Sequence, residues 1–205
     1  GLGDVYKRQV SKAVLPRQGE VIYAGKRLDR YSPKFLAQKI AYLAQVHTSP
    51  PDIDVRTLVS YGRYPYSKFG RGLTEKDTVI IDNALERTGL SGLQNQILAT
   101  LSGGEIKRIE IATMLARGTK MSIFDEPEAG IDLWSFQNLI SVFEKMHEAI
   151  HGSILIISHQ ERILETADKI VVLVDGEIRA IGSKDEIMPV LMQASSVCSR
   201  LADKV

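Results

Sequence analysis

The stretch "LSGGEIKRIEIATMLARG", residues 101–118, reads as a helical run that two glycines open. Ser102 and Glu105 stand at the spacing of a capping box, which marks a helix N-terminus. The free N–H groups and the positive dipole end of such a helix attract anions, phosphate above all. We therefore expect residues 101–105 to face a phosphate group.

Short apolar runs alternate with helical stretches on both sides of this helix. The expected strands are 20–25, 39–45, 120–124, 153–158, 169–174 and 177–182; the expected helices are 34–38, 55–66, 74–90, 132–150, 161–167 and 184–205. Strands that alternate with helices favour an α/β fold with a largely parallel sheet.

Local signals support several of these boundaries. Ser32 followed by Pro33 is typical of a helix start. Thr74 and Asp77 form a second candidate capping pair, and Gly89 is placed to end that helix. Asp175-Gly176 predicts a hairpin turn between the last two strands.

The composition is that of an ordinary globular protein, with 44% hydrophobic and 25% charged residues and a formal net charge of +1. This balance gives no support for a nucleic-acid partner. The lone cysteine, Cys198, excludes a disulfide framework and suits a reducing cytosol. No apolar run approaches the length of a membrane span. If the protein acts at a membrane, we expect it to bind at the membrane surface without crossing it.

The first nine residues, "GLGDVYKRQ", correspond to the translation of a transposase adapter used in sequencing libraries. Such scars are excluded from fold reasoning. We expect the native part to begin at Val10, a partial domain to cover residues 10–192 and a C-terminal tail to cover 193–205.

Three of the expected strands end in polar residues that could carry chemistry. Gln45 follows the strand at 39–45, Asp125 and Glu126 follow 120–124, and His159 follows 153–158. In an open α/β sheet, ligands bind beyond the carboxyl ends of the strands. Gln45 or His159 alone is more often structural, whereas adjacent carboxylates after an apolar strand can divide the work of holding Mg²⁺ and activating water.

Four motifs then occur in order, "LSGGE" at 101–105, "MSIFDEP" at 121–127, "AGID" at 129–132 and "ISH" at 157–159. Together they resemble the ATP-binding cassette (ABC) ATPases. The resemblance implies an α/β nucleotide-binding domain of the P-loop NTPase type, with a mostly parallel sheet and a helical subdomain at about 50–117. It also implies ATP and Mg²⁺ as cofactors and ATP hydrolysis as the activity.

The resemblance carries a role over to each matching residue. Asp125 resembles the Mg²⁺ carboxylate and Glu126 the general base, while His159 resembles the switch histidine near the γ-phosphate. Gln45 resembles the glutamine that touches Mg²⁺ or the attacking water, and Asp132 resembles the aspartate that crosses a dimer interface. The signature residues Leu101, Ser102, Gly103, Gly104 and Glu105 would cover ATP held by a second subunit, so a head-to-tail dimer is implied.

The chain departs from the family pattern in one respect. "GEVIYAGK" has the wrong spacing for the phosphate loop G-x-x-x-x-G-K-[ST], and Arg27 stands where Ser or Thr must touch Mg²⁺. We therefore expect the phosphate loop and the adenine-stacking aromatic residue to precede Val10. On this interpretation the parent protein is an ATPase and the printed chain is inactive.

The two halves of the chain resemble different branches of the family. Residues 29–90, with "GRYPY" at 62–66, resemble the ATPases of iron–siderophore and cobalamin importers, whereas "LSGGEIKRIEIA" and "SHQERIL" resemble the sulfur-mobilisation ATPase of iron–sulfur cluster assembly. Importers commonly have Gln-Arg where this chain has Lys107-Arg108. A chimeric assembly joined near residues 90–100 and a genuinely intermediate family both remain open.

We favour the importer interpretation, because the segment after Gln45 is where a permease would dock. It implies a cytoplasmic ATPase subunit, peripheral at the inner face of the cell membrane, that works with membrane permease subunits. The alternative is an ABC ATPase that works with cluster-assembly proteins, away from the membrane.

Overall fold

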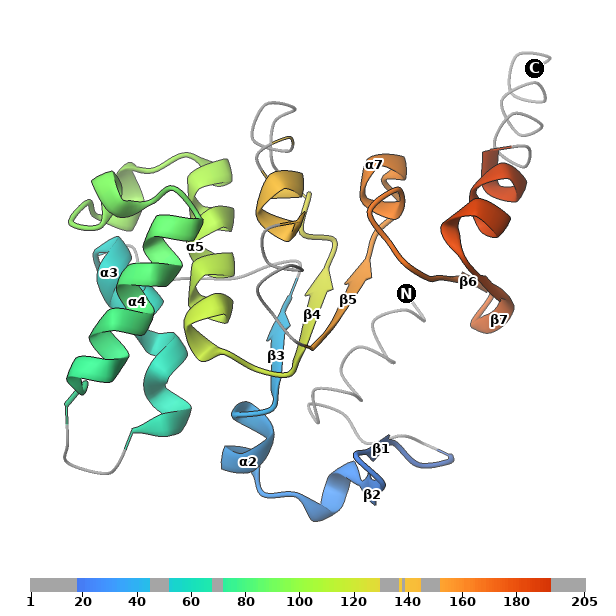
Figure 1. Ribbon diagram of the computed structural model, residues 1–205, viewed down its shortest axis with the longest axis horizontal. Helices are drawn as coiled ribbons and strands as arrows, with labels where there is room; N and C mark the ends of the chain where they lie inside the picture. Colours follow the sequence, from blue (N-terminus) through green and yellow to red (C-terminus); the bar gives the residue numbers. More distant parts are fainter. Residues whose placement is uncertain are drawn as a thin grey trace. The chain divides into compact units, whose positions relative to one another are not determined.

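The computed structural model describes residues 18–44, 52–67, 72–129, 137, 139–144 and 152–192. The described residues fall into two compact units, one ending at Ile157 and the other beginning at Ser158 (Figure 1). The adapter-like residues 1–9, the start of the native part at Val10 and the tail 193–205 lie outside the described residues.

The first unit is built on a parallel sheet of three strands, β3 (Ile40–Leu43), β4 (Met121–Asp125) and β5 (Ser153–Ile157), in the order β3-β4-β5. The central strand β4 is apolar and largely buried, as a strand with a neighbour on each side should be. Leu43 pairs with Phe124, and Asp125 pairs with Ile157. The carboxyl ends of the three strands therefore meet at one edge, and the predicted parallel sheet is confirmed.

The chain between β3 and β4 forms a group of helices. These are α3 (Val55–Ser60), the 3₁₀ helix η2 (Tyr61–Tyr66), α4 (Glu75–Arg87), the short 3₁₀ turns η3 (Ser91–Leu93) and η4 (Leu98–Thr100), and α5 (Gly103–Arg117). They share one apolar core, to which α3 contributes Val55 and Val59, α4 contributes Ile81 and Leu85, and α5 contributes Ile109. Burial of these side chains holds the helices together.

Both predicted capping boxes are present. Ser102 caps α5 through the N–H of Glu105, whose carboxylate in turn accepts from the N–H of Ser102, and Thr74 and Asp77 do the same for α4. Gly89 takes the left-handed φ of 67° that ends α4. These local expectations hold because each depends on residues within one helical turn.

The single helix expected at 55–66 is wrong in one respect. It is α-helical only to Ser60 and continues as the 3₁₀ helix η2. Pro65 cannot donate an α-helical hydrogen bond, and Gly62 lies so close to the backbone of α5 that a Cβ there would overlap the carbonyl oxygen of Thr113. The change from an α-helix to a 3₁₀ helix thus falls where the chain packs closely on α5.

The N-terminal part of the first unit is smaller than the sequence pattern predicts. In place of the strand expected at 20–25, the structure has the two-residue strand β1 (Ile22–Tyr23). It pairs antiparallel with β2 (Lys26–Arg27). A 3₁₀ turn η1 (Leu28–Arg30) and the short helix α2 (Pro33–Ala37) follow, the latter capped by Ser32 as predicted.

The second unit contains α7 (Glu161–Leu164), the hairpin strands β6 (Ile170–Val174) and β7 (Glu177–Gly182), and helical residues 184–192. The helix expected at 161–167 ends early, at Leu164. Asp175 and Gly176 both have positive φ, of 50° and 81°, as the predicted two-residue hairpin turn requires.

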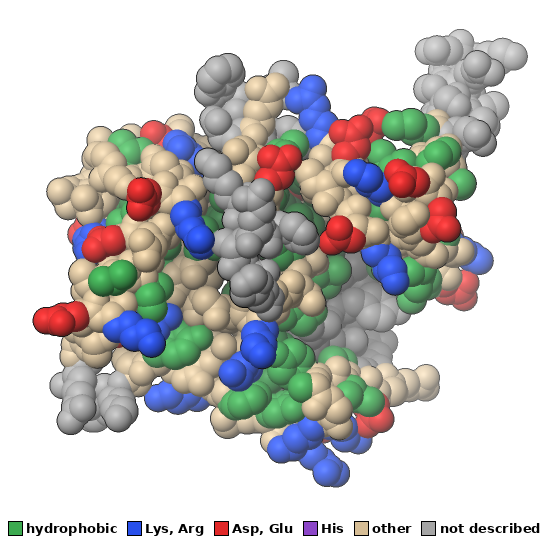
Figure 2. All heavy atoms as spheres, in the orientation of Figure 1, with side chains coloured by type: hydrophobic (Ala, Val, Ile, Leu, Met, Phe, Trp, Pro, Cys, Tyr) green, Lys and Arg blue, Asp and Glu red, His purple; other side chains and the backbone are tan. Residues whose placement is uncertain are grey.

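None of the described helices is both long and apolar enough to cross a membrane. On the face shown in Figure 2, side chains of Lys and Arg are interspersed with those of Asp and Glu over the helices of the first unit.

Candidate functional site

The candidate site begins at the carboxyl end of β4, where the chain leaves the sheet. Asp125 is the last residue of this central strand, and only 3% of it is exposed. A carboxylate so placed must have hydrogen-bond or ionic partners, because burial of a lone charge is costly. Asp125 was predicted to lie at the carboxyl end of this strand, and the structure confirms that position.

One partner of Asp125 was not predicted. The hydroxyl of Tyr42, on the neighbouring strand β3, donates to Oδ2 of Asp125 at 3.1 Å. Tyr42 pairs in register with Ile123, so Tyr42, Ile123 and Asp125 share one face of the sheet. The sequence shows a tyrosine in an expected strand. It does not show that this strand lies beside β4, so the contact could not be predicted.

Glu126 has a strained backbone. Its φ is 44°, a left-handed conformation that costs a residue with a side chain about 1 kcal/mol or more. Two hydrogen bonds hold it there: its N–H donates to the carbonyl of Ile157 at 2.9 Å, and its carbonyl accepts from the N–H of Ala129 at 3.0 Å. The turn thus fixes the direction in which Glu126 leaves the sheet, half-buried beside Asp125.

The signature residues form the N-terminus of α5. The carboxylate of Glu105 accepts from the hydroxyl of Ser102 at 2.7 Å and from its N–H at 2.8 Å. These bonds, first the one from the backbone, lower the pKa of Glu105 below its usual value. Ser102 and Gly103 are exposed, whereas Gly104 is buried and Leu101 packs on the helical core.

Helix α5 connects the two parts of the candidate site. It ends at Arg117 and is capped by Gly118, which takes a left-handed φ of 63°. The chain then enters β4. Because α5 and β4 run in opposite directions, the signature end of α5 and the carboxyl end of β4 lie at the same end of the first unit (Figure 1).

Where the three remaining predicted site residues lie relative to this site is not part of the described structure. Gln45 and Asp132 lie outside the described residues. His159 is exposed and belongs to the unit that begins at Ser158. The roles expected for these three residues stay predictions.

The described residues contain no cluster of three or more His, Cys, Asp or Glu side chains that could hold a metal ion. Mg²⁺ does not need such a cage, because it usually binds through one or two carboxylates together with substrate phosphates. A buried carboxylate at the carboxyl end of a parallel strand therefore fits Mg²⁺ that arrives with a nucleotide.

A family model described as "ABC transporter" matches residues 8–129. The chain belongs to the ABC transporter family. ATP hydrolysis, with ATP bound usually together with Mg²⁺, is the activity of ATPases of this family.

The relatives of this family member include ATP-binding proteins of iron uptake. The chain is 30% identical over 182 residues to the ferric enterobactin transport ATP-binding protein FepC of Escherichia coli K12, covering 88% of this chain and 67% of that protein. It is 34% identical over 153 residues to the iron(3+)-hydroxamate import ATP-binding protein FhuC of Bacillus subtilis, covering 74% of this chain and 56% of that protein. The chain thus spans between about half and two thirds of the length of these relatives.

Solved structures confirm the fold of this chain. The ADP conformation of MJ1267, an ATP-binding cassette of an ABC transporter, matches with a TM-score of 0.80 at 21% identity, over 95% of this chain and 81% of that one. The cbiO1 structure from Clostridium perfringens matches with a TM-score of 0.78 at 24% identity, over 98% of this chain and 80% of that one.

Proposed function

We propose that this chain is part of the ATP-binding subunit of an ABC importer and couples ATP hydrolysis to the import of iron–siderophore complexes. The observation that carries the proposal is the pair Asp125–Glu126, with Asp125 buried at the end of β4 and Glu126 held at a φ of 44° beside it. The names of FepC and FhuC supply the solute class.

Each residue of the pair has its own task. Asp125, whose carboxylate accepts a hydrogen bond from Tyr42, would hold Mg²⁺, and the cation would supply charge neutralisation on the phosphates. Glu126 orients the attacking water and accepts its proton as the general base. In this proposal one carboxylate serves the cation and the other serves the water.

The signature residues act on a second subunit. The N-terminus of α5 offers backbone N–H groups and a positive dipole end to a γ-phosphate held by the partner. Gly103 and Gly104 allow the backbone to approach closely, because they add no Cβ. Hydrolysis then requires a head-to-tail dimer, in which Asp132 crosses the interface and His159 contacts the γ-phosphate.

The dimer works with membrane permease subunits at the inner face of the cell membrane. In this proposal Gln45 contacts Mg²⁺ or the attacking water and transmits the state of the site to the permease. The relatives named above offer no support for cobalamin as the solute or for iron–sulfur cluster assembly as the role.

The experiment measures ATP hydrolysis by the product of the reading frame that encodes this chain in its source genome, here called the complete product. With Mg²⁺ and ATP, we expect the complete product to turn over ATP. Glu126→Gln should reduce turnover of the complete product by about 100-fold or more while ATP still binds. Undiminished turnover in Glu126→Gln would remove the general base from the proposal.

The solute is tested in proteoliposomes with the permease from the same locus. ATP-dependent uptake of a ferric siderophore, absent in Glu126→Gln, is the expected result, with cobalamin as the matched control solute. Uptake of cobalamin alone would show that the solute class is wrong.

A further inference from the structure

The bond between Tyr42 and Asp125 joins two strands that are far apart in the sequence. The donor and acceptor lie 83 positions apart along the chain, and the oxygen atoms are 3.1 Å apart. The phenol hydroxyl is the donor and the carboxylate oxygen is the acceptor. A bond from a donor to a charged acceptor is stronger than one between neutral groups.

The geometry of the sheet explains how the bond forms. Tyr42 pairs with Ile123 across β3 and β4, and Asp125 is the next residue of β4 on the same face. Two residues of a strand span about 6.6 Å. The Tyr42 hydroxyl crosses this offset and meets the carboxylate from the side of β3.

The ring and the hydroxyl of Tyr42 have separate tasks. The ring packs against an apolar cluster made of Leu28, Leu36, Ile40 and Ile123. A phenylalanine would fill that place equally well, so packing gives no reason for the hydroxyl. One contact that does use the hydroxyl is its bond to Asp125.

We propose that Tyr42 is a positioning residue for the metal carboxylate, because its hydroxyl holds Oδ2 of Asp125 and so limits the orientations that this carboxylate can take toward a bound cation. The inference rests on the proposed function, in which Asp125 binds the cation. Groups that hydrogen-bond a ligating carboxylate set its orientation, and their loss typically weakens metal binding 10- to 100-fold. Tyr42 acts through Asp125 and does not itself touch the nucleotide.

The test measures Mn²⁺ binding by electron paramagnetic resonance, in the presence of a non-hydrolysable ATP analogue, on the product of the complete reading frame. Tyr42→Phe should weaken Mn²⁺ binding by about 10-fold or more while the analogue still binds. The matched control is Tyr31→Phe. Tyr31 packs on the same apolar cluster, and its hydroxyl donates to the carbonyl of Tyr23 at 2.9 Å, so this variant also loses one phenol hydrogen bond.

Urea unfolding of both variants separates positioning from stability. We expect similar shifts of the unfolding midpoint in Tyr42→Phe and Tyr31→Phe, with weakened Mn²⁺ binding in Tyr42→Phe alone. Unchanged Mn²⁺ binding in Tyr42→Phe, with binding abolished in Asp125→Asn, would overturn the positioning role and leave the proposed function standing. Unchanged binding in Asp125→Asn would overturn both.

Discussion

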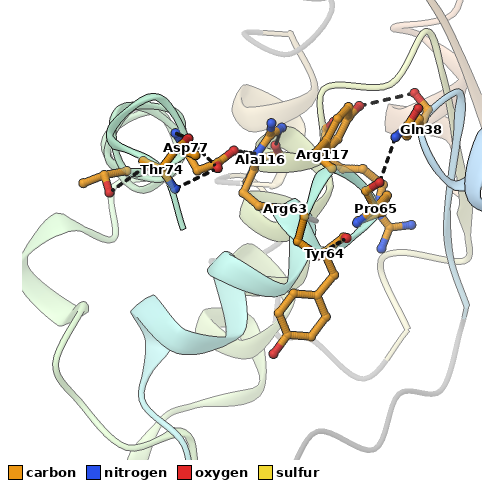
Figure 3. A network of polar contacts seen from close by, with 11 residues as sticks. Gln38, Arg63, Tyr64, Pro65, Thr74, Asp77, Ala116 and Arg117 are labelled. Carbon is orange, nitrogen blue, oxygen red and sulfur yellow. Dashed lines mark hydrogen bonds and ion pairs between the residues drawn. The ribbon is translucent and has the colours of Figure 1, made fainter. Parts of the chain in front are cut away.

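The guanidinium of Arg63 lies between Asp77 and the C-terminal end of α5 (Figure 3). Its Nε donates to Oδ1 of Asp77 at 2.7 Å, and its Nη1 donates to the carbonyl of Ala116 at 2.8 Å. Only 9% of the Arg63 side chain and 15% of the Asp77 side chain are exposed. One buried cation thus joins η2, the start of α4 and the end of the signature helix.

Tyr66 extends this network toward the sheet. Its ring lies 4.0 Å from the Arg63 guanidinium carbon, and its hydroxyl donates to the carbonyl of Arg117 at 2.7 Å. Gln38, which directly follows α2, donates to the carbonyl of Pro65 at 2.7 Å. The network therefore fixes α5 at the end opposite to its signature residues.

We expect Arg63→Ala to lower the free energy of unfolding by about 2–4 kcal/mol, because it leaves a largely buried carboxylate and a helix carbonyl without their donor. Urea unfolding followed by circular dichroism measures the loss. The matched control is Asp82→Ala, which breaks the 2.6 Å pair of Arg56 and Asp82, where the Asp82 side chain is 54% exposed. Exposed pairs contribute about 0–1 kcal/mol, so equal losses in the two variants would contradict the prediction.

Asp77 should make the stability of the first unit depend on acid pH. Hydrogen bonds from Thr74, first from its side chain and then from its backbone, together with Arg63, lower the pKa of Asp77 from 3.8 to about 2. A folded-state pKa below the unfolded one means that the ionised form stabilises the fold. This contribution is complete above about pH 4 and is lost as the pH falls toward about 2.

The measurement is the free energy of urea unfolding between about pH 5 and about pH 2.5, for the wild type and for Asp77→Asn. We expect the wild type to lose more stability over this range than the variant, so that the two curves converge at low pH. Parallel curves would show that Asp77 does not carry the dependence.

Gly62→Ala should destabilise the contact between η2 and α5. A Cβ at residue 62 would overlap the carbonyl oxygen of Thr113 and would lie 3.1 Å from Cβ of Ala116. Overpacking of this kind costs about 1–3 kcal/mol. The control is Gly92→Ala, where a Cβ meets nothing within 4 Å, and thermal unfolding should distinguish the two variants.

The two capping boxes offer a test of the signature serine. Ser102→Ala and Thr74→Ala each remove a side chain that caps a helix, so each should cost about 1 kcal/mol of stability. On the proposed function, only Ser102→Ala should also weaken ATP-dependent dimerisation, measured by light scattering on the product of the complete reading frame. Equal dimerisation of the two variants would indicate that Ser102 serves the helix alone.

Much of the local structure could be predicted because its causes are local. The caps at Ser32, Thr74 and Ser102 and the hairpin turn at Asp175 each depend on residues within a few positions of one another. The split of the helix at 55–66 has one local contributor, Pro65, which the sequence shows. The other contributor, the close packing of Gly62 on Thr113 and Ala116 of α5, joins residues far apart in the chain and could not be predicted in the same way.

Short motifs at fixed spacing were enough to predict the family, the parallel α/β class and the positions of Asp125, Glu126 and the signature residues. That β4 lies between β3 and β5, so that Tyr42 meets Asp125 across 83 positions of the chain, could be learned only from the folded structure. The physical reason is that strand order and register are set by burial of the whole sheet, a property that no single segment carries.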